Sequence, residues 1–321
     1  MAIRKSEFAL ALNQVATERG IPVEDVLESI KSAVRIAYKK EYEDEDVENY
    51  IVEIDPNTGE AKIFNGKKNI TPPGFGRIAA QTAKQVIIQK VREAEKKAVV
   101  HYFDKQVGSI ITGRIIRSDG KNVYVDIGRA EAILPQEEQI KDEKYYPNNR
   151  VLFYLVSVDG EDNRYKIIIS RRHKELIKEL FKREVPELAR GSIEIMKIVR
   201  EAGNRTKIAV NSKERGIDSV GSCVGQKGVR IQAVINSLGI DEKIDVIQWS
   251  DDPKTLIINA ISPSKSIDVV IREKEKEADL FVDSEELSLV IGREGQNIRL
   301  ASQLTGYSLN ALTKDKENAK K

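Results

Sequence analysis

The strongest constraint on the fold of this chain is an internal repeat in its C-terminal half. The motif Gly225-Gln-Lys-Gly228 recurs as Gly292-Arg-Glu-Gly295, and a further glycine, Gly239 or Gly306, follows each motif after the same interval. Self-similarity at a constant spacing indicates copies of one structural unit. We therefore expect two copies of one small domain, each with its glycine motif between two helices.

The residues around both motifs predict the same order of elements: two strands and a short helix before the motif, a helix and a strand after it. In the first copy these segments are 192–199, 206–211, 219–224, 229–238 and 244–249. In the second they are 266–272, 278–282, 285–291, 296–304 and 307–312. The expected domains span 173–261 and 262–313, and residues 314–321 are expected to form a disordered tail.

The repeated motif has the chemistry of a phosphate clamp. Glycines let the backbone approach a phosphate closely, and the next helix begins with unpaired N–H groups and the positive end of its dipole. Glu294 should repel phosphate, so we expect the first copy to bind more strongly. The candidate phosphate-binding residues are Gly225, Gln226, Lys227, Gly228 and Arg230 in the first copy, and Gly292, Arg293, Gly295 and Arg299 in the second.

Residues 106–172 predict a small β domain. Short β-rich runs are punctuated by turns, and the candidate strands are 108–116, 122–127, 131–134, 150–158 and 165–170. Five strands in so short a segment favour a closed barrel, because open edges would pair with other chains. An OB-fold is the leading candidate.

Residues 1–105 predict a mainly helical domain. Apolar residues at helical spacing, among them Phe8, Leu12 and Val15, precede the break at Gly20-Ile-Pro22 and a second helical stretch that ends near Tyr38. Residues 50–54 and 61–64 then predict a β-hairpin, and 77–105 a long amphipathic helix. The apolar stripe of that helix is either a docking face for a partner or a surface that packs on the first two helices.

Charge is distributed unevenly in a chain whose formal net charge is only +2. Residues 197–230 hold eight basic residues against three acidic ones, whereas residues 231–260 hold two basic residues against five acidic ones. We interpret the basic window as one positive face; the alternative is an ordinary solvated surface.

The composition disfavours several classes of protein. No stretch is apolar for long enough to cross a membrane, and residues 1–20 are charged and periodic rather than signal-like, so we expect a cytoplasmic protein. The single cysteine, Cys223, cannot form an internal disulfide, and His101 and His173 are too few for a metal site, so no metal or cofactor is expected. Carboxylates form no recognisable acid/base pattern and no phosphate-binding loop of the GxxxxGK[ST] type occurs, so we expect no enzyme.

The glycine motifs and their flanking residues resemble KH domains of the bacterial type, type II. Residues 218–234 are similar to the first KH domain of the NusA family, residues 286–301 to its second KH domain, and residues 75–90 to its N-terminal domain. Domain order agrees over nearly the whole chain. The resemblance implies a multidomain α+β protein with an N-terminal domain, an S1-type OB barrel and two tandem KH domains, without the acidic C-terminal repeats of longer members.

The NusA family comprises bacterial factors for transcription elongation, termination and antitermination. The resemblance implies that residues 1–105 bind RNA polymerase, and that the barrel and KH domains hold single-stranded nascent RNA. Other antitermination factors are candidate partners, and we expect a monomer. In the barrel, Tyr124 occupies an expected aromatic position, whereas Lys121 and Pro135 replace residues that are typically aromatic and histidine.

Because the barrel offers few stacking rings, we expect it to bind RNA only weakly. Tyr124, Lys121 and Arg129 are its candidate RNA contacts, together with Arg114 and Arg164. For Tyr124 the alternative is a rim residue that packs within the barrel. Cys223 is expected to be a small buried side chain, and Trp249 a core residue rather than a base platform.

Two other functions fit parts of the pattern. Phosphorolytic ribonucleases also combine an S1-type barrel with a KH domain, but their catalytic domains come first and their KH domain precedes the barrel. Ribosomal proteins with KH domains usually carry strongly basic tails, which a net charge of +2 does not match. An RNA-processing enzyme subunit therefore stays the alternative to the NusA-type factor.

Overall fold

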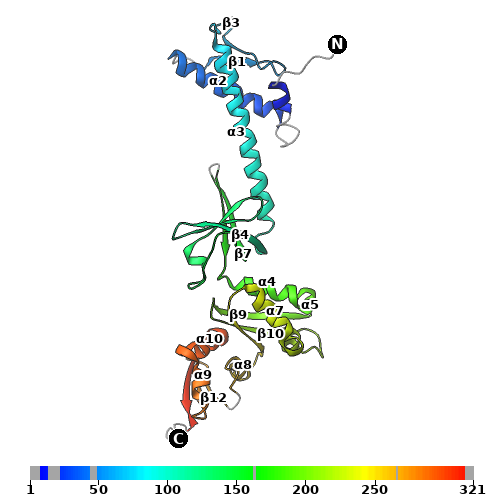
Figure 1. The fold of residues 1–321 in the computed structure, drawn as a ribbon, viewed down its shortest axis with the longest axis vertical. Coiled ribbons are helices and arrows are strands. Elements are labelled where there is room, and N and C mark those ends of the chain that lie inside the picture. The colour runs from blue at the N-terminus through cyan, green and yellow to red at the C-terminus, as the bar shows by residue number, and fades with distance from the viewer. Residues whose placement is uncertain (1–7, 14–21, 44–48, 162–163, 265–266, 315–321) are drawn as a thin grey trace. The chain divides into compact units, whose positions relative to one another are not determined.

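The structure is a computed structural model of the chain, and it describes residues 8–13, 22–43, 49–161, 164–264 and 267–314 (Figure 1). The chain divides into two compact units. The first comprises Met1–Lys105 with Asp159–Tyr165, and the second comprises Gln106–Val158 with Lys166–Lys321. No helix in the described ranges is long and apolar enough to cross a membrane.

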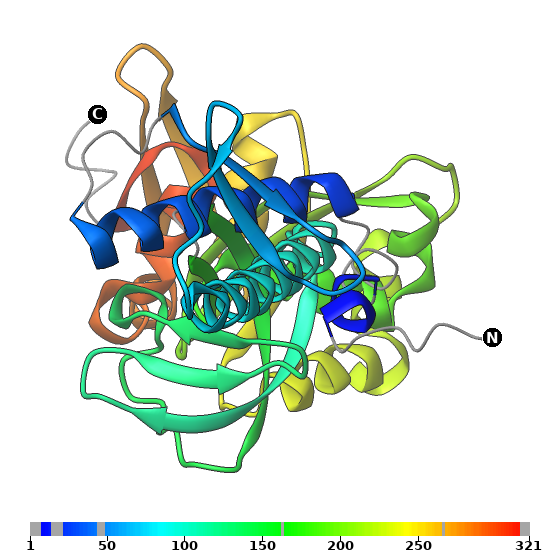
Figure 2. The ribbon, with the colours of Figure 1, turned by 90° about the horizontal axis from the view of Figure 1, so that it is seen from above.

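The first unit is built on two crossing helices. Helix α2 (Val23–Tyr42) buries Val26, Ile30, Val34 and Tyr38 on one stripe, and α3 (Phe75–Asp104) buries Phe75, Ala79, Ala83 and Ile87. Both stripes repeat every fourth residue, which places their members on one helix face. The two helices pack across each other at a steep angle (Figures 1 and 2). The small side chains of Ala79 and Ala83 let them approach closely.

A small antiparallel sheet completes this unit. Strands β1 (Ile51–Ile54) and β2 (Ala61–Asn65) form the predicted hairpin, and β3 (Lys68–Asn69) adds a short third strand. Residues 8–13 are helical and Leu12 is buried, as expected, whereas Val15 lies outside the described residues. Of the two possibilities for the apolar stripe of α3, packing within this unit holds as far as Val91, whereas Ala94 and Ala98 lie outside the core.

The barrel prediction is confirmed. Its strands close in the order β4-β5-β6-β8-β7. They are β4 (Ile110–Ser118), β5 (Val123–Asp126), β6 (Glu131–Leu134), β7 (Arg150–Glu161) and β8 (Arg164–Ser170). A Cβ atom on Gly113 would lie 2.3 Å from a methyl carbon of Val125, so β4 needs glycine where it faces β5.

The first glycine motif lies in a domain with a three-stranded sheet of order β11-β10-β9. Strand β10 (Arg205–Ser212) pairs antiparallel with β9 (Ile193–Glu201) and parallel with β11 (Lys243–Gln248). Helices α6 (Ser219–Val224) and α7 (Val229–Leu238) flank the motif and share a core with β9 and β10.

Two helices in this domain were not predicted: α4 (Lys174–Glu184) and α5 (Pro186–Arg190). Their sequence signal is present. Leu176, Ile177, Leu180 and Phe181 are buried on one face of α4, and the His173 side chain caps its start by accepting a hydrogen bond from the Glu175 N–H.

The second copy repeats this arrangement with β12 (Ile267–Arg272), β13 (Glu277–Val282), α9 (Leu287–Ile291), α10 (Gln296–Thr305) and β14 (Ser308–Thr313). Helix α8 (Pro253–Ala260), which precedes β12, was also not predicted. Residues of both copies belong to one hydrophobic core, among them Val199 and Ala209 of the first and Leu280 of the second, and α10 lies against β9 and β10. The second copy therefore covers the face of the first sheet that is opposite to α7.

The first residue of the expected disordered tail, Lys314, is described. Its ammonium group lies 3.1 Å from a carboxylate oxygen of Asp283. Residues 315–321 lie outside the described residues.

Candidate nucleic-acid interface

The two glycine motifs have the same backbone conformation. Gly225 and Gly292 have φ/ψ of 75/168° and 73/175°, and the third residues of the motifs, Lys227 and Glu294, have 52/24° and 52/28°. The second glycines, Gly228 and Gly295, are both left-handed. The repeat found in the sequence is therefore a repeat of local geometry.

The first glycine of each motif is required because the loop folds back onto the following helix. A Cβ atom on Gly225 would lie 3.1 Å from the backbone nitrogen of Arg230 and 2.9 Å from its Cγ. A Cβ atom on Gly292 would lie 2.9 Å from the backbone nitrogen of Asn297. No side chain larger than hydrogen fits either position without displacing the helix.

Helices α7 and α10 begin at the second glycine of each motif, without a side-chain cap. Their first N–H groups have no partner within the helix, and these groups, together with the helix dipole, attract an anion. Gln226 and Lys227 are exposed beside this helix start. In the second motif the side chains of Arg293 and Glu294 are exposed by 93% and 84% and lie 3.9 Å apart. Their opposite charges therefore partly cancel.

Arg230, a predicted RNA contact, is held inside its own domain. Its Nη1 donates to the Ser222 carbonyl at 2.7 Å and to Glu187 at 3.0 Å. Asn297 occupies the matching position of the second copy, where its amide donates to the carbonyls of Leu289 and Val290 at 3.2 Å. Both side chains tie the helix after the motif to the helix before it.

Arg299, also a predicted RNA contact, joins the two copies. Its guanidinium donates to the Glu201 carboxylate at 2.6 and 3.0 Å, and Gln296 donates to the same carboxylate at 2.8 Å. The hydrogen bond from Arg299 is the largest influence that holds the pKa of Glu201 below its usual value. Arg299 therefore fastens the second copy to the edge of the first sheet.

The interpretation of residues 197–230 as one positive face is wrong. Most of its cations form ion pairs with carboxylates from outside the window. The pairs are Arg200 with Glu242, Arg205 and Lys207 with Asp245, Lys213 with Glu194, and Arg230 with Glu187, at 2.7 to 3.0 Å. Two of these carboxylates come from the acidic window that follows, so the two windows partly neutralise each other across the sheet.

The candidate contacts of the barrel lie at both ends of strand β5, with Lys121 in the turn before this strand and Arg129 in the turn after it. Tyr124 is half-buried and its hydroxyl donates to Asp119 at 2.9 Å, whereas Lys121 and Arg129 are exposed. Arg114 pairs with Asp126 at 2.9 Å. Hydrogen bonds from the N–H groups of Asn122 and Lys121, and then from Tyr124, lower the pKa of Asp119 to about 2. The side chain of Arg164 lies outside the described residues.

A groove of about 610 Å³ runs between the helices and the edge strand of the second copy. The lining residues are Ile291 of α9, Ile298 of α10, and Leu309, Asn310, Ala311 and Leu312 of β14, with Arg272 and Asp279. The lining therefore combines apolar and polar side chains, and Ile291 directly precedes the glycine motif.

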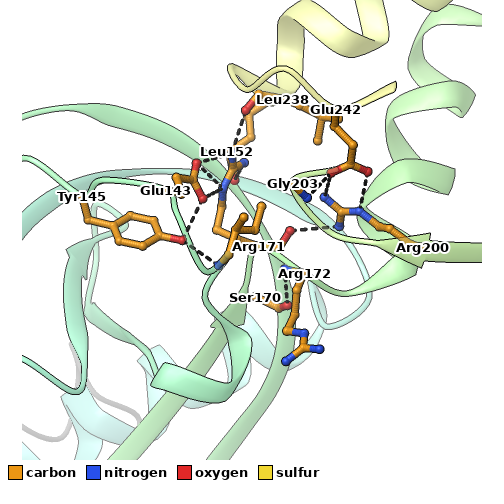
Figure 3. Close-up of polar contacts among 11 residues, drawn as sticks. Glu143, Tyr145, Leu152, Ser170, Arg171, Arg172, Arg200, Gly203, Leu238 and Glu242 are labelled. Carbon is orange, nitrogen blue, oxygen red and sulfur yellow. Dashed lines mark hydrogen bonds and ion pairs between the residues drawn. The ribbon is translucent and has the colours of Figure 1, made fainter. Parts of the chain in front are cut away.

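A buried polar network joins the barrel to the first copy (Figure 3). The guanidinium of Arg171 is fully buried, and its Nε donates to both carboxylate oxygens of Glu143 at 3.0 Å. It also donates to the carbonyls of Leu152 in the barrel and Leu238 at the end of α7, at 2.8 and 2.7 Å. Tyr145 donates to Glu143, and burial raises the pKa of its phenol.

A second ion pair extends the network into the sheet. Arg200 meets Glu242 with two bonds of 2.8 Å, and its Nη1 donates to the carbonyls of Arg171 and His173 (Figure 3). Glu242 also accepts from Thr206 at 2.6 Å. The barrel and the first copy are thus held in one orientation. No sequence pattern predicted these residues, because their partners come from distant segments.

Four models of known domains match the chain. The NusA N-terminal domain matches residues 7–73 and 67–97, and the S1 RNA binding domain matches residues 104–172. A NusA-like first KH domain matches residues 171–249, and a NusA-like second KH domain matches residues 253–319. The matched order is the order of the described barrel and of the two glycine-motif domains.

Whole proteins are also similar to this chain over most of their length. The transcription termination/antitermination protein NusA of Bacillus subtilis is 39% identical over 337 residues, which cover 95% of this chain and 90% of that protein. The protein of the same name from Thermus thermophilus is 37% identical and covers 95% and 89%. The solution structure of the N-terminal domain of B. subtilis NusA is 30% identical, covers 29% of this chain and 98% of that one, and has a TM-score of 0.24.

Proposed function

This chain belongs to the NusA family of transcription termination/antitermination proteins, and from that premise we propose that it binds RNA polymerase and holds nascent RNA. By holding the transcript it modulates pausing, termination and antitermination. One observation carries the RNA-binding part of the proposal: two glycine motifs with the same backbone conformation open onto uncapped helices. Such helix starts bind phosphate.

The proposal divides the work among the domains. Residues 1–105 bind the polymerase, the barrel at 106–172 and the KH domains at 173–261 and 262–313 bind single-stranded RNA, and other antitermination factors are further partners of a monomer. Lys227 adds a cation to the first clamp. The second clamp has weaker charge, but a groove with both apolar and polar lining lies beside it and can accept a nucleobase.

We propose that the protein binds RNA without cleaving or degrading it. Cys223 is fully buried among apolar residues, and burial raises the pKa of its thiol to about 12, so it stays protonated and unreactive at neutral pH. Within the described ranges, no group of His, Cys, Asp or Glu has a metal-binding arrangement. An assay for phosphate-dependent RNA degradation tests the enzyme alternative, and the expected result is no degradation.

The division between polymerase and RNA is tested with two fragments. Residues 1–105 are expected to retain core RNA polymerase in a pulldown, and residues 106–321 to bind labelled single-stranded RNA. The reverse pattern, or an N-terminal fragment with no affinity for polymerase, contradicts the proposal.

The glycine motifs are tested by inverting their charge while keeping their glycines. We expect Gln226→Asp/Lys227→Asp to weaken RNA binding most, because two carboxylates then face the bound phosphate. Lys227 is left-handed, a conformation that Asp tolerates, so the fold should survive with a change below about 1 kcal/mol.

The second motif provides a matched control. Arg293→Asp/Glu294→Asp is expected to weaken RNA binding less, because Glu294 already contributes one negative charge. The expected order of affinity is wild type, second-motif variant, first-motif variant, with polymerase binding unchanged in all three. RNA titration measures this order, with circular dichroism as the check of folding. A folded first-motif variant that binds RNA like the wild type would remove this motif from the function.

A further inference from the structure

The guanidinium of an arginine lies over the aromatic ring that the barrel was expected to offer to RNA. Arg117 on β4 is the cross-strand partner of Tyr124 on β5, and its guanidinium carbon lies 3.6 Å from the centre of the Tyr124 ring. That distance is in the range of a close cation–π contact. One face of the ring is therefore covered and unavailable for a base.

Contacts on both sides hold this stack in place. The Tyr124 hydroxyl donates to Asp119, whose other carboxylate oxygen accepts from the N–H groups of Lys121 and Asn122 at 2.9 and 2.7 Å. Asp119 stays ionised at neutral pH because its pKa is about 2. On the other side, Arg117 lies 3.4 Å from a carboxylate oxygen of Glu131 on β6. The ring and the guanidinium are thus oriented before any ligand arrives.

We propose that Arg117 is the surface on which the barrel binds a nucleobase of single-stranded RNA, with Tyr124 as its support. A guanidinium is planar and has two faces, and the side chain of Arg117 is 53% exposed although one face rests on the ring. Nucleobases stack on guanidinium planes as they do on aromatic rings. Every base has a π-face, so this site should accept any of the four.

This inference rests on the proposed function, because it adds a base-binding residue to a barrel that binds RNA. It also changes the expected role of the barrel. The sequence indicated little stacking surface, but the stack of Arg117 on Tyr124 supplies a preoriented platform that is also cationic. The barrel then contributes a base contact, which depends on the plane of Arg117 and not only on its charge.

Substitution of Arg117 by lysine separates the effect of the planar guanidinium from the effect of its charge, since lysine keeps the positive charge and has no planar group. Arg172, which follows the last barrel strand, is a matched control. It is exposed, its guanidinium donates to the Glu137 carbonyl at 3.0 Å, and no aromatic ring lies against it among the described residues. Arg117→Lys and Arg172→Lys therefore make the same chemical change at two exposed positions.

The experiment titrates the full-length protein and both variants into single-stranded RNA that contains 2-aminopurine. We expect Arg117→Lys to reduce affinity at least about fivefold, the lower end for loss of one stacked base. It should also reduce the quenching of the fluorescent base. Arg172→Lys should bind like the wild type, and both variants should keep the wild-type dependence on salt because the charge is retained.

Tyr124→Leu is a second variant that leaves Arg117 unchanged. It removes the support, so it should reduce affinity as much as Arg117→Lys, and the double variant should lose no more than either single one. Circular dichroism and urea unfolding check that each variant is folded. If Arg117→Lys misfolds, Tyr124→Leu still tests the stack.

The outcomes separate this inference from the proposed function. A wild-type protein that does not bind single-stranded RNA overturns the RNA-binding function itself. A wild type that binds, with folded Arg117→Lys and Tyr124→Leu variants that bind and quench equally well, overturns only the platform.

Discussion

At the scale of single residues, the two glycines of a motif meet different demands. Gly225 combines φ/ψ of 75/168° with a close approach to Arg230. Gly228 is left-handed, and a Cβ atom there would lie 3.7 Å from a methyl carbon of Ile231, an ordinary contact distance. The first conformation is essentially restricted to glycine, and the second is strained but accessible to other residues.

Alanine scanning of the motif should therefore be asymmetric. Gly228→Ala is expected to lower the free energy of unfolding by about 1 kcal/mol, the cost of a left-handed alanine. Gly225→Ala should cost more, about 2–4 kcal/mol, because strain is added to a clash with the backbone of α7. Urea unfolding of both variants measures the difference. Equal losses would show that the close approach at Gly225 relaxes without cost.

At the scale of elements, the Glu201 carboxylate at the end of β9 accepts hydrogen bonds from α10 of the second KH domain. Glu201 accepts from both Arg299 and Gln296, and its side chain is 24% exposed against 49% for Arg299. Solvent screens a pair this accessible, so it orients the two domains more than it stabilises them. The apolar residues shared between the copies supply the main attraction.

Glu201→Gln tests this contact and its dependence on pH. The free energy of unfolding should fall by about 0.5–1 kcal/mol at pH 7, as for a partly exposed ion pair. The pKa of Glu201 is lowered in the folded state, so its contribution is complete above the ordinary value of 4.5 and is lost as pH falls through the folded value. The difference between wild type and variant should be equal at pH 7 and pH 5.5 and shrink below pH 4.5.

Urea unfolding at these pH values checks the expectation. Arg293→Gln is the control, because Arg293 is almost fully exposed and pairs only weakly with its neighbour Glu294. A difference that grows as pH falls towards 4 would contradict the assignment of the lowered pKa to this contact.

At the scale of the whole molecule, buried charged side chains join the barrel to the first KH domain. Each of these charges would be costly to bury without its partner. Arg171 has no exposed surface, and its charge is met by Glu143 from the barrel and by two carbonyls, one of them at the end of α7. A buried ion pair adds little net stability, but removal of one partner leaves the other charge unpaired. The network therefore enforces one orientation of barrel and KH domain.

Arg171→Met is expected to lower the free energy of unfolding by about 3–5 kcal/mol, because Glu143 is left buried without its cation. Arg172→Met is the adjacent control. Arg172 is exposed and its guanidinium donates to the Glu137 carbonyl, so a change within about 0.5 kcal/mol is expected. Arg171→Met/Glu143→Met should recover part of the loss, since it removes both charges. Thermal unfolding of the three variants decides the matter, and a double variant less stable than Arg171→Met would contradict this account.

Local pattern alone predicted most elements of this protein. Alternation in the barrel strands, helical spacing in α3 and the repeated glycine motif all act between neighbours in the chain, so they are visible without the fold. The same holds for Cys223, whose apolar neighbours indicated burial. The helices α4, α5 and α8 had comparable signals and were missed.

The partners of the charged residues were decided only by the tertiary structure. Arg230 and Arg299 carry the charge expected of phosphate contacts, but α5 and β9 bring Glu187 and Glu201 to them. Arg299 and Glu201 are 98 positions apart, and nothing local links such residues. A charge attracts whichever opposite charge the packing places within a few ångströms, so the stacking of the domains determines which cations stay free for RNA.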